Sequence, residues 1–114
     1  MYELLLTHRA VISAYAFVSG NKNLKRKSFY MAMDQWKDLK SNPNLGFANQ
    51  VTYGTLLRAC ANLLPESTER DEAVRLFFEE CKVNGFLTPR IVDQVQTAAS
   101  TALYQELMAS CTTN

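Results

Sequence analysis

The stretch that decides the fold is VTYGTLLRACA, residues 51–61. Its larger apolar side chains stand at Tyr53, Leu56, Leu57 and Cys60, at the spacing of one face of an α-helix. The whole chain has 26 Leu and Ala against nine Val and Ile, and strict alternation of apolar and polar residues never runs for six positions. We therefore predict an all-α protein.

Working outward from this stretch, the same periodicity and the usual start and stop signals predict about six helices. They are expected at residues 2–18, 25–40, 52–64, 68–84, 88–99 and 100–108. Thr68, Thr88 and Ser100 are the expected N-caps of the last three, and Pro89 suits the first helical position after Thr88. Asn84 and the glycine after it should end the fourth helix.

Length and composition narrow the class of protein. The chain has 114 residues, 47% hydrophobic and 20% charged, which suits one ordinary globular domain. No apolar run approaches the roughly 20 residues that a membrane-spanning helix needs, and the acidic start does not resemble a signal peptide. Cys60, Cys81 and Cys111 are too dispersed for a disulfide framework or a zinc site and indicate reduced thiols; no metal or cofactor is expected.

The chain contains an internal repeat. Residues 7–16 align without a gap on residues 52–61, at a separation of 45 positions. Residues 32–40 align on residues 73–82 with a shift of one position. A hairpin of two amphipathic helices is therefore expected to occur twice.

The second copy resembles the pentatricopeptide repeat family. Residues 51–60 match the first helix of that family's unit, and residues 72–82 with Gly85 resemble its second helix. The resemblance implies a single domain, residues 1–114, folded as a right-handed α-solenoid, a tetratricopeptide-like superhelix. Its units would span about 6–50 and 51–89, followed by capping helices at about 90–110. Tetratricopeptide repeats and an unrelated array of helical hairpins share the same periodicity and stay open as alternatives.

The resemblance also implies a function, which is non-catalytic binding of single-stranded RNA in organellar RNA metabolism. It places a base between Leu6 and Val51 and assigns base choice to Arg9 with Asn49 in the first unit. In the second unit the corresponding position is Gly54, paired with a residue near Thr88 or Pro89. Glycine has no side chain to read a base, so base-unspecific contact is expected there. The family points to a mitochondrion or plastid, although no Arg- and Ser-rich leader precedes Tyr2.

Charge is unevenly distributed along the chain. Residues 1–64 hold eight Lys or Arg against three Asp or Glu, whereas residues 65–114 hold four against eight. The densest positive cluster, called here the basic patch, is Lys22, Lys25, Arg26 and Lys27, expected on the turn between the first two helices. It is a candidate electrostatic contact for a polyanion, and a merely solvated turn is the alternative.

A protein-interaction scaffold is the competing function, with a peptide or helix on the same face of the repeats. Two units are few for a repeat protein, which favours either a terminal piece of a longer repeat protein or self-association. An enzyme is not expected, because His8 is the single histidine and Asp34 and Asp38 have lysines nearby for surface ion pairs. The large aromatic residues with helical spacing are expected in the core: Phe29, Trp36, Phe77 and Phe78.

Overall fold

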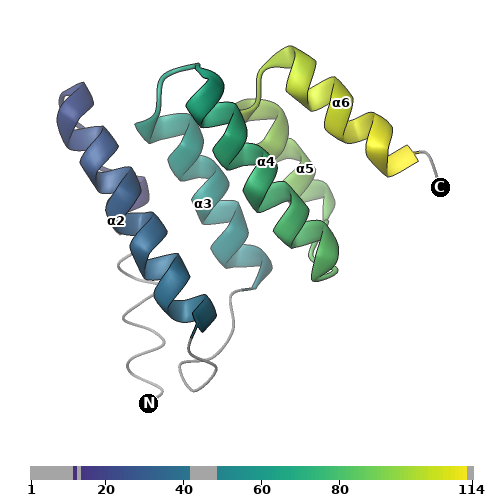
Figure 1. Ribbon diagram of the computed structural model, residues 1–114, viewed down its shortest axis with the longest axis horizontal. Helices are drawn as coiled ribbons and strands as arrows, with labels where there is room; N and C mark the ends of the chain where they lie inside the picture. The colour runs from purple at the N-terminus through teal and green to yellow at the C-terminus, as the bar shows by residue number, and fades with distance from the viewer. Residues whose placement is uncertain (1–11, 13, 42–48, 113–114) are drawn as a thin grey trace.

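The computed structural model describes residues 12, 14–41 and 49–112, and every regular element among them is a helix. The labelled helices are α2 (Lys22–Ser41), α3 (Gln50–Leu63), α4 (Thr68–Val83), α5 (Pro89–Ala98) and α6 (Thr101–Thr112) (Figure 1). Ile12 and residues 14–16 are helical as well. The predicted all-α class is therefore confirmed for the described part of the chain. None of these helices combines the length and the apolar character needed to cross a membrane.

The helices begin where side chains cap them. The Asn49 side chain accepts from the Thr52 amide at 3.0 Å and the Thr52 hydroxyl accepts from the Asn49 amide at 3.3 Å, so α3 begins at Gln50, two residues before its predicted start. Thr88 caps α5 as predicted, by accepting from the Ile91 amide. The predicted cap of α4 was wrong, because Ser67 and not Thr68 accepts from the first turn.

Two further boundaries also differ from the prediction. The Asn21 side chain accepts from the Leu24 amide at 2.8 Å, and this cap starts α2 at Lys22 rather than at residue 25. Ser100 caps α6 as predicted, but the helix continues to Thr112 instead of ending at residue 108. Gly85 follows α4 with φ +75°, a left-handed conformation that suits glycine and ends the helix as expected.

Helix α3 lies at the centre of the packing. It contacts α2, α4 and α5, while α4 also packs on α5 and α6. Figure 1 shows α4 in front of α5, with α3 beside them. The molecule measures 41 × 35 × 20 Å, and its smallest dimension corresponds to two layers of helices.

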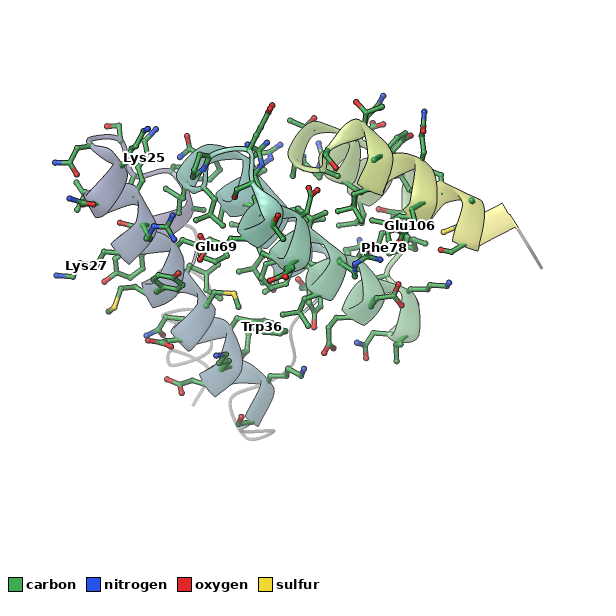
Figure 2. The ribbon with its side chains drawn as sticks, turned by 45° about the horizontal axis from the view of Figure 1, so that its top comes forward. Lys25, Lys27, Trp36, Glu69, Phe78 and Glu106 are labelled. Atoms are coloured by element: carbon green, nitrogen blue, oxygen red, sulfur yellow. The ribbon has the colours of Figure 1, made fainter. Side chains whose placement is uncertain are left out.

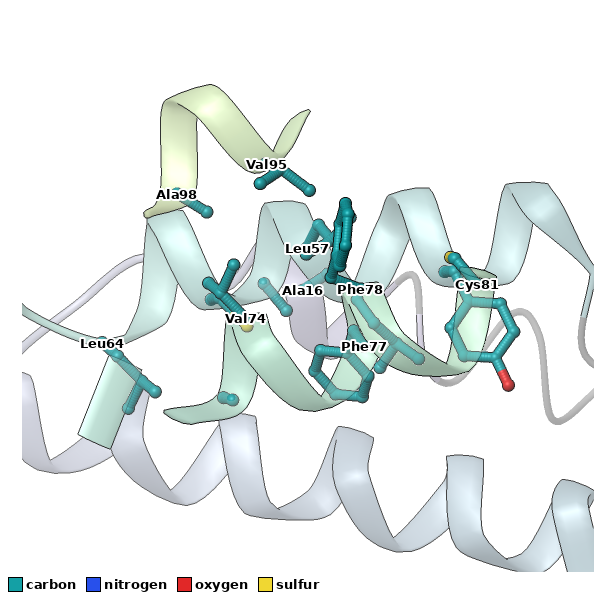
Figure 3. Packing of buried hydrophobic residues seen from close by; sticks show 14 of the residues in the cluster. Ala16, Leu57, Leu64, Val74, Phe77, Phe78, Cys81, Val95 and Ala98 are labelled. Atoms are coloured by element: carbon teal, nitrogen blue, oxygen red, sulfur yellow. The ribbon is translucent and has the colours of Figure 1, made fainter. Parts of the chain in front are cut away.

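One hydrophobic cluster joins all of these elements. It extends from Ile12 through the centre of the molecule to Leu107 of α6, and Figure 3 shows Leu57, Phe77 and Phe78 converging in it. The Trp36 ring meets the Phe77 ring edge-on, with 5.2 Å between their centroids. The four aromatic residues predicted to lie in the core are buried: Phe29, Trp36, Phe77 and Phe78.

The start of α4 holds the turn between α5 and α6. The Arg70 guanidinium donates to the carbonyls of Ala98 at 2.8 Å, Thr97 at 3.2 Å and Leu64 at 3.3 Å. The neighbouring Asp71 carboxylate accepts from the Ser100 amide at 3.0 Å and from its hydroxyl at 2.7 Å. Carbonyls at the ends of α3 and α5, which have no partner within their helices, are satisfied in this way.

Ion pairs connect α2, α4 and α6 along their exposed side. They are Arg26 with Glu69, Lys40 with Glu80, and Arg75 with Glu106. The Tyr30 hydroxyl also donates to Glu69, and this bond, with Arg26, lowers the pKa of that carboxyl below its usual range. Lys40 therefore pairs between helices, and not with the aspartates of its own helix that the sequence suggested.

Candidate ligand-binding groove

A groove of about 490 Å³ opens between the first turns of α3 and α5. From α3 it is lined by Gln50, Val51, Gly54, Thr55 and Arg58, and from α5 and its cap by Thr88, Pro89, Arg90, Ile91 and Gln94. The two helices can form one groove because α5 packs directly against α3. Their capping residues place both helix starts at the same end of the molecule.

The inner part of the groove is small and apolar. Gly54 contributes no side chain, and a Cβ atom placed on it would lie 3.6 Å from the Ile91 Cδ1 atom, at ordinary van der Waals distance. The Ile91 side chain is buried beneath it. Val51 has 68% of its surface exposed, and Pro89 lines the same groove from the α5 side. This lining offers an apolar contact surface that the fold itself leaves open.

The polar part of the groove consists of hydrogen-bond donors. With the Gln94 amide oriented so that its oxygen faces Arg58, that oxygen accepts from Nε at 3.0 Å and from Nη2 at 3.3 Å. Arg90 is exposed and has no side-chain partner among the described residues. The lining contains two arginines and no aspartate or glutamate, and it includes the first turns of α3 and α5, which are the positive ends of their dipoles. The groove therefore favours an anionic or acceptor-rich ligand.

The structure brings together only some of the residues that the sequence singled out. Val51 and Gly54 both line the groove, as do Thr88 and Pro89. Asn49 instead uses its side chain in the capping box of α3, where it positions the helix. Leu6 and Arg9 lie outside the described residues, as does His8.

Sequence reasoning missed the α5 side of the groove. Arg90, Ile91 and Gln94 were assigned to a capping helix with no motif of its own. The available signal was the start of that helix: a side chain caps α5 at Thr88 as one caps α3 at Asn49, so the hairpin α5–α6 begins like the hairpin α3–α4.

The basic patch lies at the other end of the helices. Its four residues belong to the first turns of α2 and not to a turn between helices, because Asn21 starts the helix early. Figure 2 shows Lys25 and Lys27 projecting from this end of α2. Arg26 pairs with Glu69 at the start of α4, next to the end of α3. None of the four patch residues lines the groove, which extends along α3 from Gln50 to Arg58.

The polar side chains of the groove lining are threonine hydroxyls, glutamine amides and two guanidinium groups. Its lining has no carboxylate, histidine, cysteine, lysine or tyrosine to act as a general acid, a general base or a nucleophile. Elsewhere, Cys60 and Cys81 are buried free thiols, and burial raises the pKa of each to about 12. The described residues contain no group of three or more His, Cys, Asp or Glu that could hold a metal ion.

Comparisons with protein-family models, with curated proteins and with solved structures find no match to this chain. Three properties of the groove bear on the function of the protein. It is open along one face, it combines an apolar rim with two cationic side chains, and it lies between helices that start two successive hairpins.

Proposed function

We propose that this chain is a helical-repeat module of the pentatricopeptide type that binds single-stranded RNA without catalysis, as part of organellar RNA metabolism. The observation that carries the proposal is the carboxylate-free groove between the starts of α3 and α5. These helices open the hairpins α3–α4 and α5–α6, so the groove lies between the starts of two successive hairpins. The family resemblance expects a base between the starts of successive first helices, which it identifies here as Leu6 and Val51.

A right-handed α-solenoid is the arrangement that we propose for the hairpins. In each ion pair between α2, α4 and α6 the cation belongs to the earlier helix and the carboxylate to the later one. Such head-to-tail pairing is expected when like units stack in one direction, each contacting its neighbours. In this arrangement α3 and α5 form one face of the stack and the ion-paired helices form the other.

RNA would be held by apolar contact and by charge. A base can lie against Val51 and Pro89 at the rim, while the arginines attract the backbone. Gly54 offers no side chain for a hydrogen bond to the base edge, so little sequence preference is expected at this groove. Contact with one base contributes about 1–3 kcal/mol, which predicts weak binding by one groove alone.

The proposal is tested by titrating labelled single-stranded RNA of random sequence at two salt concentrations. We expect saturable binding that strengthens at low salt. Val51→Asp should weaken it about tenfold or more, because the new carboxylate repels the backbone at the rim. The matched control is Val83→Asp, the same change at a valine that is 82% exposed and outside the groove.

Absence of saturable RNA binding at low salt would refute the proposal. Binding of a peptide in the groove, lost in Val51→Asp and kept in Val83→Asp, would then identify a protein-interaction scaffold. Equal weakening of RNA binding by both substitutions would show that the groove is not the RNA-binding face.

A further inference from the structure

We infer that Arg58 and Arg90 form a clamp for one phosphate group in the groove between α3 and α5. The inference rests on the proposed RNA-binding function and specifies which part of the nucleotide this groove recognises. It assigns the contact to the backbone, and it identifies two residues to which the family resemblance gives no role.

The two groove arginines differ from the other exposed arginines. Arg26 and Arg75 each pair with a glutamate on a neighbouring helix. Arg58 and Arg90 line the same groove, and neither has a carboxylate partner among the described residues. Like charges at one groove repel each other, and this repulsion is relieved when an anion binds between them.

Arg58 is held in place before a ligand arrives. Its Nε and Nη2 groups donate to the Gln94 oxygen across the groove, which leaves Nη1 without a partner in the described part of the chain. An amide acceptor fixes the plane of the guanidinium but leaves its positive charge uncompensated. The side chain therefore loses less conformational entropy on binding than a free surface arginine would.

Arg90 stands at an electrostatically unfavourable place for a cation. It is the second residue of α5, where the positive end of the helix dipole disfavours a positive side chain. The start of α3 adds a second positive end at the same groove. An anion bound in the groove would be stabilised by both helix starts and by both guanidinium groups.

A phosphate matches this set of donors better than a carboxylate does. One guanidinium already satisfies both oxygens of a carboxylate, while a phosphate can accept from two guanidinium groups and from helix amides together. The volume of about 490 Å³ leaves room for the sugar and base beside it. A phosphodiester within RNA and a terminal phosphate monoester share this chemistry.

The test is the salt dependence of binding to a single-stranded RNA oligonucleotide. Neutralising one phosphate contributes about 0.7 to the slope of log affinity against log salt, so the double variant Arg58→Gln with Arg90→Gln should lose about that amount. Lys37→Gln, at an exposed lysine of α2 outside the groove, is the control and should leave the slope unchanged. Thermal unfolding checks that each variant is folded.

A second measurement uses the RNA instead of the protein. Oligonucleotides with a neutral methylphosphonate linkage should bind the wild-type protein more weakly, and the double variant should show a smaller penalty. Comparing 5′-hydroxyl with 5′-phosphate ends separates the two sources of phosphate. A gain for the 5′-phosphate that depends on the arginines indicates a terminal monoester, and equal binding indicates an internal diester.

The outcomes distinguish this inference from the proposed function. One outcome is that the protein binds RNA and Val51→Asp weakens this binding, but the double variant keeps the full salt slope. In that case the proposed clamp is wrong and the RNA-binding function stands. If the wild-type protein binds no RNA, both fall. Arginine-dependent binding of a peptide carboxylate in place of RNA would also overturn both.

Discussion

At the scale of single residues, Gly54 affects both the stability of α3 and the space in the groove. Glycine inside a helix costs roughly 0.5–1 kcal/mol relative to alanine, because it loses more backbone entropy on folding. Nothing in the local structure requires it: Gly54 has no positive φ, and a Cβ atom would make only ordinary contact with Ile91. The residue therefore weakens its helix while it keeps the groove open.

We predict that Gly54→Ala raises the free energy of unfolding by about 0.5–1 kcal/mol, measured by urea denaturation. Gly85→Ala is the control of opposite sign and should destabilise the protein, because Gly85 has φ +75°. Gly54→Leu should fill the groove and weaken RNA binding in a folded protein. Loss of stability in Gly54→Ala would show that the helix depends on this glycine.

At the scale of elements, the short helix α5 depends on its neighbour α4. With 10 residues, α5 is too short to be stable alone. Arg70 of α4 satisfies the carbonyls of Thr97 and Ala98 at its end, and Asp71 holds the following turn. Because α5 forms one wall of the groove, these contacts also position the candidate site.

We predict that Arg70→Met lowers the free energy of unfolding by about 1–3 kcal/mol, since it leaves the helix-end carbonyls without their charged donor. Arg75→Met is the matched control five residues along the same helix. Arg75 pairs with Glu106 in an exposed ion pair, so little change is expected. Equal losses in the two variants, measured by denaturant unfolding, would contradict the role of Arg70.

At the scale of the whole molecule, a single core should make unfolding cooperative. Cys60 of α3 and Cys81 of α4 are buried in the shared cluster, while Cys111 of α6 is half-buried at its edge. Burial raises the pKa of the first two thiols from 9.0 to about 12. The stability that these two thiols contribute as neutral groups is present below pH 9.0 and is lost as the pH rises toward about 12.

We predict that a thiol reagent at pH 8 modifies Cys111 first and that Cys60 and Cys81 react later at one shared rate. Both buried thiols become accessible only when the common core opens. Mass spectrometry of the modified protein measures the three rates, and in urea all three cysteines should react together. Early reaction of Cys81 alone would show that α4 opens independently.

Local signals in the sequence were enough to locate most of the helices. Periodic apolar residues identified the core faces of α3 and α4, and the Thr88 cap followed by Pro89 located the start of α5. Single capping residues were harder to choose. Ser67 and Thr68 both carry a hydroxyl, and Ser67 is the residue with the extended backbone conformation of an N-cap, whereas Thr68 is already helical.

The sequence by itself determined the helical class and the buried aromatic residues, because helix periodicity and side-chain hydrophobicity are local properties. Only the tertiary structure decided that Arg58 and Gln94 meet and that Arg90 faces the same groove. These contacts depend on α5 packing beside α3, and no local pattern records which two helices become neighbours. The same packing separated the basic patch from the groove, since α2 and α3 run in opposite directions.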